Sequence, residues 1–416
     1  MRKAASLVIC LLSIMMCRSV VADVQYVITD LGSLSGPAGY SIAWGINNSG
    51  VVVGETKVAD GIGHAFMWTI DGGMQDLGTL GGTNSQAFSI NDLGVVVGSS
   101  YTTGDTASQA FTYTAGGPMT SLGTLGGSNS LANSINKSGD IVGASDITGA
   151  TAYHAFLYRG GIWTDLHSSD GYNSTAWCIN NSGVIAGELD TGTGTTAHAF
   201  VLGDTLEDLG TFGGANSCAL AINDSGVVVG YADTAGIYTH AFRYSGGLLE
   251  DIGAPDTDSF AYGINSSGVI VGVSNSKAVK WDTGGMVDLN TLIDSNAGWQ
   301  LEAANGINKD GQIVGSGRTT QNGTSVLHAY LLTPASSFGS VSGIISLGSN
   351  YQGDITKFPI MVELCKHEGS TTTRTVNLDP SGAFTLQNVP IGIYDISFKA
   401  SHWLKKVVYA VEVKST

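Results

Sequence analysis

Basic residues are scarce in this chain. The 416 residues contain 18 Lys and Arg against 34 Asp and Glu, and residues 23–334 hold 8 basic side chains against 28 acidic ones. This imbalance argues against nucleic acid and anionic membranes as partners, because both repel an acidic surface. A simpler role of the acidity is to keep an exported protein soluble.

Long apolar runs are confined to the N-terminus. Arg2 and Lys3 precede an apolar run from Ala4 to Met16, and Val20-Val21-Ala22 forms a small-residue cleavage motif. This order predicts a secretory signal peptide over residues 1–22. No later window has the roughly 18 apolar residues of a membrane-spanning helix. We therefore expect a secreted protein, extracellular or at the cell surface, with no membrane span.

Cysteine is also scarce. Once the signal peptide is removed, Cys178, Cys218 and Cys365 remain. An odd number in an exported protein leaves at least one thiol unpaired or paired between molecules, and the sequence does not fix the oligomeric state. Cys178 and Cys218 fall on strands whose faces meet, so a disulfide is one alternative. Two buried free thiols are the favoured one.

Motifs of known catalytic chemistry are absent from the sequence. It has no Gly-x-Ser-x-Gly elbow in a strand–helix context and no helix-borne zinc motif. No segment spaces acidic residues as a calcium loop does, although calcium binding stays an alternative. We therefore expect a protein that is not an enzyme and that needs no cofactor.

The sequence does contain a repeat. Ile-Asn pairs recur seven times, about every 43 to 44 residues, each with Ala three positions before the Ile and Gly four positions after it; the Ile residues are Ile46, Ile90, Ile135, Ile179, Ile222, Ile264 and Ile307. Small residues at alternate positions before the Ile predict a strand with one smooth face. The Gly predicts a tight hairpin turn into a second strand.

Two further motifs complete each repeat. A third strand begins with His-Ala-Phe or a variant, as at His64-Ala65-Phe66, and a fourth ends in Asp-Leu-Gly or a variant. Four strands with this period are typical of a β-propeller blade. The last repeat, ending at Leu332-Thr333-Pro334, has no fourth strand, whereas Tyr26–Gly32 has the fourth-strand sequence and precedes the first repeat. This count predicts that Tyr26–Gly32 completes the seventh blade.

With these motifs, residues 24–334 resemble the bacterial extracellular HAF repeat family. The resemblance implies export and a β-rich repeat fold, and no established activity. From residue 335 the repeat stops, and strands are expected at Val341–Leu347, Ile360–Cys365, Thr373–Leu378, Ala383–Leu386, Gly392–Ala400 and Lys406–Val413. The segment Asp379–Ile396 resembles the carboxypeptidase-regulatory-like (prealbumin-like) β-sandwich, which implies an accessory module.

The predicted fold is therefore all-β: a seven-bladed β-propeller over residues 23–334, closed by an N-terminal strand, and a small β-sandwich over residues 335–416. The His, Ser and Asp residues of the repeats are the side chains of a catalytic triad. A nucleophile is needed once, however, so a set repeated in every blade is better explained as a hydrogen-bond network that ties a blade together.

Acidic residues recur in the connections between second and third strands. Five of these connections carry one aspartate each: Asp60, Asp105, Asp146, Asp190 and Asp233. Propeller geometry places them around one channel mouth, where a ring of carboxylates can bind calcium or sugar hydroxyls. The favoured alternative is that they shape hairpin loops. The sequence thus predicts a non-catalytic binding or cell-surface structural module, its ligand an extracellular glycan or protein; the alternative is a glycan-active hydrolase with a carboxylate pair at the mouth.

Overall fold

The computed structural model describes residues 25–149, 152–167, 172–192, 195–321, 323–335, 338–344, 360–366, 371–390, 392–399 and 406–413. The expected signal peptide lies outside these residues. The chain divides into two compact units, one formed by Ile28–Thr333 and one that includes Pro334–Thr416. All of the long elements in the described residues are β-strands, and a 3-10 turn, η1, spans Leu289–Thr291.

The first unit consists of seven four-stranded antiparallel sheets. From the inner to the outer strand, the first four sheets are β2 (Ser41–Ile46), β3 (Val52–Ala59), β4 (Ile62–Thr69), β5 (Gly73–Asp76); β6 (Gly81–Ile90), β7 (Val95–Thr102), β8 (Ser108–Thr114), β9 (Thr120–Gly123); β10 (Gly126–Ile135), β11 (Ile141–Ile147), β12 (Tyr153–Arg159), β13 (Ile162–Asp165); and β14 (Ser174–Ile179), β15 (Ile185–Asp190), β16 (Ala197–Leu202), β17 (Leu206–Gly210).

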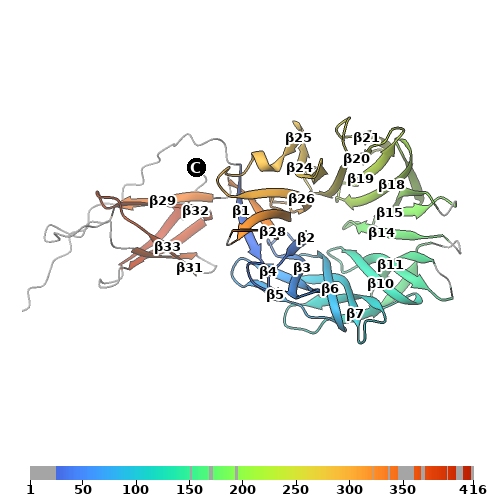
Figure 1. Ribbon diagram of the computed structural model, residues 1–416, viewed down its shortest axis with the longest axis horizontal. Helices are drawn as coiled ribbons and strands as arrows, with labels where there is room; N and C mark the ends of the chain where they lie inside the picture. Colours follow the sequence, from blue (N-terminus) through green and yellow to red (C-terminus); the bar gives the residue numbers. More distant parts are fainter. Residues whose placement is uncertain are drawn as a thin grey trace, which may run out of the picture. The chain divides into compact units, whose positions relative to one another are not determined.

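The remaining three are β18 (Gly213–Ile222), β19 (Val228–Thr234), β20 (Thr239–Ser245), β21 (Leu248–Asp251); β22 (Ser259–Ile264), β23 (Ile270–Ser274), β24 (Lys277–Asp282), β25 (Gly285–Asp288); and β26 (Trp299–Ile307), β27 (Ile313–Gln321), β28 (Thr324–Pro334), β1 (Tyr26–Gly32). Each inner strand contacts the inner strand of the next sheet, and β26 in turn contacts β2. Figure 1 shows this propeller-like order, from blue β2 through green β14 to orange β26.

The predicted smooth strand face is interrupted by a bulge in every sheet. Between Ala87 and Ser89, for example, β6 has two residues opposite one residue of β7. The bulge brings the inner strand so close to its neighbour that a Cβ on Gly98 would lie 1.9 Å from the Gln86 carbonyl oxygen. The second-strand glycine of each repeat is therefore required by close approach of the two backbones.

The apolar core lies between neighbouring sheets. The phenylalanine of the His-Ala-Phe motif is among its large members, and Phe66 and Phe111 are fully buried. Phe111 packs with Val53 and Ala65 of the preceding sheet, so each sheet buries the apolar face of the one before it. The interface between the seventh and first sheets is built in the same way, with Val314 and Leu331 packed against Phe66.

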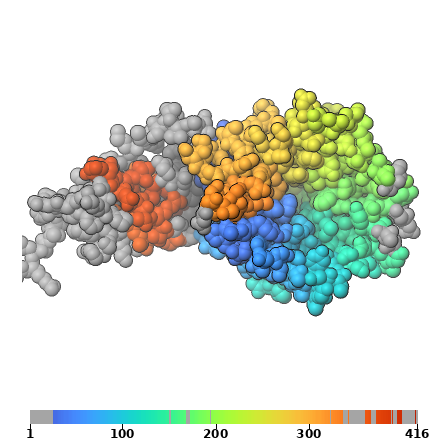
Figure 2. Space-filling model, in the orientation of Figure 1, coloured from blue at the N-terminus to red at the C-terminus, as the bar shows by residue number. Residues whose placement is uncertain are grey.

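The strand Tyr26–Gly32 pairs as the sequence predicts. β1 is the outer strand of the seventh sheet and lies beside β28, although the two are about 300 residues apart in the chain. Figure 2 shows the same closeness, with blue N-terminal residues against the orange residues of the last sheet. The seventh sheet is thus formed from both ends of the unit, which stabilises the interface between the seventh and first sheets.

The second unit contains six strands in two antiparallel sheets. One pairs β29 (Phe338–Ile344) with β32 (Ala383–Pro390), and the other has the order β31 (Thr371–Val376), β30 (Ile360–Lys366), β33 (Gly392–Lys399), β34 (Lys406–Val413). Side chains of both sheets, including Phe384, Leu386, Leu364 and Ile396, share one buried core. Two sheets that enclose a common core form a small sandwich.

Candidate functional site

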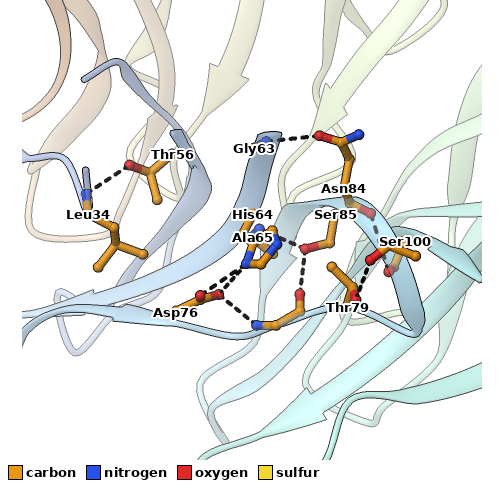
Figure 3. Close-up of polar contacts among 12 residues, drawn as sticks. Leu34, Thr56, Gly63, His64, Ala65, Asp76, Thr79, Asn84, Ser85 and Ser100 are labelled. Atoms are coloured by element: carbon orange, nitrogen blue, oxygen red, sulfur yellow. Dashed lines mark hydrogen bonds and ion pairs between the residues drawn. The ribbon is translucent and has the colours of Figure 1, made fainter. Parts of the chain in front are cut away.

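The repeated His, Ser and Asp side chains hold neighbouring strands together. His64 Nδ1 lies 2.9 Å from the Asp76 carboxylate across β4 and β5. Ser85 of the next sheet accepts a hydrogen bond from the Ala65 N–H at 2.9 Å and donates one to the Gly78 carbonyl at 2.6 Å (Figure 3). The His–Asp pair recurs as His154–Asp165, His198–Asp208, His240–Asp251 and His328–Asp30. These contacts bear out the structural interpretation of the motif.

The asparagine that follows each repeat isoleucine links the sheets in a circle. Each side chain donates from Nδ2 to the backbone carbonyl of the equivalent asparagine in the next sheet, at 3.1–3.2 Å, in the order Asn47, Asn91, Asn136, Asn180, Asn223, Asn265, Asn308 and back to Asn47. Each Oδ1 accepts from N–H groups of its own turn, as Asn47 does from Ser49 and Val51. These turns line a cavity of about 230 Å³.

The cavity shows that all seven inner turns meet at one end of the unit. We call this end the turn face; it carries the turns that follow β2 and its equivalents and, because the strands alternate in direction, the hairpins between third and fourth strands. The opposite end, the loop face, carries the connections between second and third strands. The five predicted aspartates lie on the loop face.

Four of these aspartates contact their own sheet. Asp60 is fully exposed and forms an ion pair with Lys57 Nζ at 2.7 Å. Asp105 accepts from the Thr83 N–H at 2.7 Å. Asp146 and Asp233 each accept from the backbone and the side chain of an inner-strand asparagine, Asn129 and Asn216. Their contacts are those of residues that shape connections, and the structure does not bring the five into one group; a ligand-binding role for them stays a prediction.

The fifth aspartate, Asp190, lines a cavity of about 240 Å³ on the loop face. Tyr153 of the third sheet, Asn216 of the fifth sheet and, from the fourth sheet, Asn173, Thr175 and Glu188 also line it. We call this cavity the fourth-sheet cleft. The inner strand of the fourth sheet is short: β14 has 6 residues, as do β2 and β22, whereas β6, β10 and β18 have 10 each.

The sequence explains why the inner strand of the fourth sheet is shorter than those of the second, third and fifth sheets. In the second, third and fifth sheets a Leu-Gly-Gly or Phe-Gly-Gly segment precedes the inner strand, and Leu80, Leu125 and Phe212 bridge to the end of the second strand. Leu166-His167 occupies the corresponding place before β14, so this bridging sequence is missing there. Asp190, at the end of β15, instead accepts from the Gly192 N–H at 2.9 Å.

Two carboxylates face the cleft from one strand. Glu188 and Asp190 are two residues apart on β15 and therefore point to the same side. Trp177 Nε1 donates to Glu188 at 3.3 Å. Burial raises the pKa of Tyr153, and the negative charges of Glu188 and Asp190 raise it further. Tyr153 lines the same cavity as these two carboxylates. The cleft thus combines an aromatic ring with carboxylate, amide and hydroxyl oxygens.

The sequence analysis missed Glu188. Glu188 directly follows the second-strand glycine of its repeat. At this position one other repeat has an acidic residue, Glu55, and the remaining repeats have Ser99, Ala144, Tyr231, Val273 and Ser316. Glu55 differs in its surroundings, because Tyr40 Oη and Gln86 Nε2 both donate to it at 2.6 Å. An acidic residue at a position that is otherwise small or apolar was therefore a usable indication of a site.

The described cysteines are all free thiols. Cys178 and Cys218 are buried, and burial raises the pKa of both, so their reactive thiolate forms are suppressed. Of the two alternatives left open by the sequence, the structure has the buried thiols. In the part of the chain that the structure describes, no three His, Cys, Asp or Glu side chains group as a metal site, and no helix is long and apolar enough to cross a membrane.

Comparisons with known proteins give one family and distant structural likenesses, among them one to a hydrazine synthase. No curated protein matches the chain. Hydrazine synthase from Kuenenia stuttgartiensis aligns structurally over 91% of this chain and 68% of its own, with a TM-score of 0.37 and 8% identity. A likeness at this level says nothing about activity.

The family model that matches is the one described as a protein of unknown function (DUF3466), over residues 164–383, more than half of the chain. The resemblances to HAF repeats and to a carboxypeptidase-regulatory-like domain are therefore wrong. The HAF resemblance rested on short motifs rich in glycine and small residues, and the bulges and close strand contacts described above require such residues. The chain belongs to the DUF3466 family.

Proposed function

We propose that this protein is a secreted, non-catalytic binding module in which residues 23–334 form a closed seven-bladed β-propeller and residues 335–416 an accessory sandwich. Closure is supported by the contact of β26 with β2 and by the circle of asparagine hydrogen bonds, which includes the bond from Asn308 to Asn47. Secretion is supported by the basic, apolar and small-residue order of residues 1–22.

The ligand proposed for this module is a glycan bound in the fourth-sheet cleft. The observation that carries the proposal is the lining of the cleft: Tyr153, which is 40% exposed, lines the same cavity as the carboxylates of Glu188 and Asp190. An aromatic ring packs against the apolar face of a sugar, while carboxylates and amides accept from its hydroxyls. A volume of about 240 Å³ lies below the usual range for drug-sized ligands, so one sugar unit fits better than a long segment.

The negative charge of the loop face indicates which class of glycan can bind there. Glu55, Glu188 and the five aspartates lie there, and the basic residues of this end, Lys57, Lys277 and Arg318, each form an ion pair with a carboxylate. A face with this negative field repels uronic acids and sulfate groups. Neutral or amine-bearing sugars are therefore the expected ligands.

A glycan array followed by calorimetry tests this function. The mature chain is expected to bind neutral or amine-bearing glycans, and the double substitution Glu188→Gln, Asp190→Asn is expected to weaken binding at least about tenfold, since two charged hydrogen-bond acceptors are lost. Asp60→Asn on the same face is the matched control and leaves binding unchanged.

Two outcomes contradict the proposal. The first is the absence of glycan binding, and the second is equal binding by the parent and the double variant. The glycan-hydrolase alternative has one specific observation in its favour, the two carboxylates in one cleft. If the protein releases reducing ends from a bound glycan, and the same double substitution abolishes this activity, the protein is a glycan hydrolase rather than a binding module.

A further inference from the structure

Glu55 and Glu188 occupy the same position of the repeat in the first and fourth sheets. Each directly follows the second-strand glycine. Their partners on the inner and third strands are also equivalent: Ile42 and Ala65 for Glu55, and Thr175 and Ala199 for Glu188. Because the strand pairings correspond, the two side chains leave the backbone at the same place in their sheets, and their surroundings can be compared directly.

Both carboxylate oxygens of Glu55 are hydrogen-bonded by the chain itself. Tyr40 Oη donates to Glu55 Oε1 and Gln86 Nε2 donates to Glu55 Oε2, each at 2.6 Å. Burial raises the pKa of Tyr40, and the hydrogen bond to Glu55 raises it further, so the phenol keeps its proton and remains a donor. The carboxylate at this position is thus stabilised by two uncharged donors.

The fourth sheet has no phenol at the place of Tyr40. Asn173 stands there: each of the two residues directly precedes an inner-strand serine, and each backbone carbonyl accepts at 2.9 Å, from the Lys57 N–H and from the Asp190 N–H. The Asn173 side chain contacts the third sheet, where its Oδ1 accepts from the Tyr153 N–H at 3.1 Å. It therefore does not take over the role of the phenol.

The second donor is replaced as well. Cys218 has the place of Gln86, because each directly follows the serine that accepts from the alanine N–H of the preceding sheet. A thiol is only a weak donor. Trp177 Nε1 donates to Glu188 Oε1 at 3.3 Å, which is longer than most N–H···O bonds. Among the described residues, Glu188 thus has weaker donors than Glu55, and it lines the cleft.

A third difference keeps the cleft open. A Cβ on Gly63 would lie 2.3 Å from Glu55 Oε1 and 2.5 Å from Tyr40 Oη, so the pair of phenol and carboxylate requires a glycine there. Ala197 has this place in the fourth sheet, since each of the two residues directly precedes the histidine of its repeat. Ala197 lines the cleft. A tyrosine of the chain could therefore not cover the carboxylate here as Tyr40 does in the first sheet.

We propose that Glu188 determines which ligand the fourth-sheet cleft binds, by accepting a hydrogen bond from an uncharged hydroxyl group of a neutral sugar. This inference rests on the glycan-binding function proposed above and narrows its ligand. The sugar hydroxyl takes the role that Tyr40 Oη has at Glu55. A hydrogen bond to a carboxylate is stronger than one to a neutral acceptor. The donors at this position are uncharged in both sheets, so a hydroxyl suffices and an ammonium group is not needed.

Asp190 has a different role in the cleft. It stands at the end of β15 and accepts from the Gly192 N–H at 2.9 Å. A side chain that bonds to the backbone two residues further on shapes the turn that follows it. Loss of the Asp190 charge should therefore weaken ligand binding less than loss of the Glu188 charge.

Calorimetry of the mature chain tests this inference with two neutral hexoses, glucose and galactose, and their amine-bearing counterparts, glucosamine and galactosamine. We expect at least one neutral hexose to bind, and at least as tightly as its amine counterpart. Glu188→Gln should raise the dissociation constant of that hexose at least about tenfold, and Asp190→Asn should raise it less. Glu55→Gln, the same change at the equivalent position, is the matched control and leaves binding unchanged.

A second variant transfers the arrangement of the first sheet to the fourth. Asn173→Tyr with Ala197→Gly places a phenol donor beside Glu188 and should abolish binding of the hexose. Asn129→Tyr is its control, because the third sheet has Ala144 in place of an acid. Melting curves show which variants are folded. Loss of binding in Glu188→Gln and in the transfer variant, with both controls unchanged, supports the inference.

Four outcomes overturn the inference and leave the proposed function standing. The first is equal hexose binding by the parent and Glu188→Gln while Glu188→Gln, Asp190→Asn has lost it. The second is binding of the amine-bearing sugars alone. The third is binding of array glycans but of neither neutral hexose, and the fourth is unchanged binding by a folded transfer variant. If no glycan binds at all, the proposed function fails, and this inference fails with it.

Discussion

The asparagine circle gives a quantitative prediction about the interface between the last and first sheets. Asn308 is buried; it donates to the Asn47 carbonyl at 3.1 Å and accepts from the N–H groups of Asp310 and Gln312 at 3.1 and 3.0 Å. Asn308→Ala removes these three bonds and a fourth, from Asn308 Nδ2 to Gln312 Oε1 at 2.7 Å, and leaves buried backbone groups without partners. At roughly 1 kcal/mol for each net hydrogen bond, the free energy of unfolding should fall by about 4 kcal/mol.

Asn180 offers a matched comparison within the same molecule. It donates to Asn223 at 3.2 Å and accepts from Ser182 and Val184 at 3.0 Å, so Asn180→Ala removes three bonds of the same kind between two sheets that are consecutive in the chain. Urea unfolding should give a loss for Asn308→Ala that exceeds the loss for Asn180→Ala by about 1 kcal/mol, the contribution of the additional bond to Gln312. A loss for Asn308→Ala well below that for Asn180→Ala would refute the reasoning, because it would mean that the first and seventh sheets are not joined as the others are.

Three further predictions concern acid stability, the second unit and calcium. Burial raises the pKa of Asp30, but hydrogen bonds from His328 and the Gly32 N–H, with the His328 charge, outweigh it and leave this pKa below its usual value. The resulting contribution to the free energy of unfolding is complete above the ordinary aspartate pKa of about 3.9 and is lost as the pH falls through the lowered pKa. Asp30→Asn should therefore reduce the dependence of the free energy of unfolding on acid pH. Equal pH profiles of the parent and the variant would contradict this. Residues 335–416 should fold alone around Phe384, Leu386 and Ile396, with dispersed amide resonances; a disordered spectrum would argue otherwise. Chelators should leave the melting temperature unchanged, because Asp105, Asp146 and Asp233 already accept protein hydrogen bonds; a drop abolished by Asn substitutions would show a calcium site.

The strand order was predictable from the sequence because the repeats are local signals. Each Ile-Asn turn, His-Ala-Phe strand and Asp-Leu-Gly strand end predicts its own conformation from a few consecutive residues. Counting these motifs assigns Tyr26–Gly32 to the last sheet. The six strands expected in the second unit, which has no repeat, are also present, with ends that differ by up to four residues from the predicted ones. Pro334, the last residue assigned to the repeat region, is also the last residue of β28.

The bulge and the cleft were not predictable in this way. The bulge at Phe88 depends on how closely β6 and β7 approach, which the alternation of small residues does not encode. The cleft depends on residues from three sheets, Tyr153, Glu188 and Asn216, that only the tertiary structure brings together. Of the five aspartates singled out by position, Asp190 lines this cleft because the bridging segment before its sheet is replaced, and that departure was visible in the sequence as Leu166-His167.

Deleting Asp23–Leu34 tests the central claim, closure of the ring by its first strand, most directly. The deletion removes β1, exposes the edge of β28, and takes away Asp30 and the Gly32 carbonyl that Ser41 contacts. Thermal unfolding should be compared with that of a control lacking residues 335–416. The control should keep the parent's main transition, whereas the deletion should melt markedly lower or aggregate, because the lost strand supports both flanking sheets. An N-terminal deletion as stable as the parent would contradict the account.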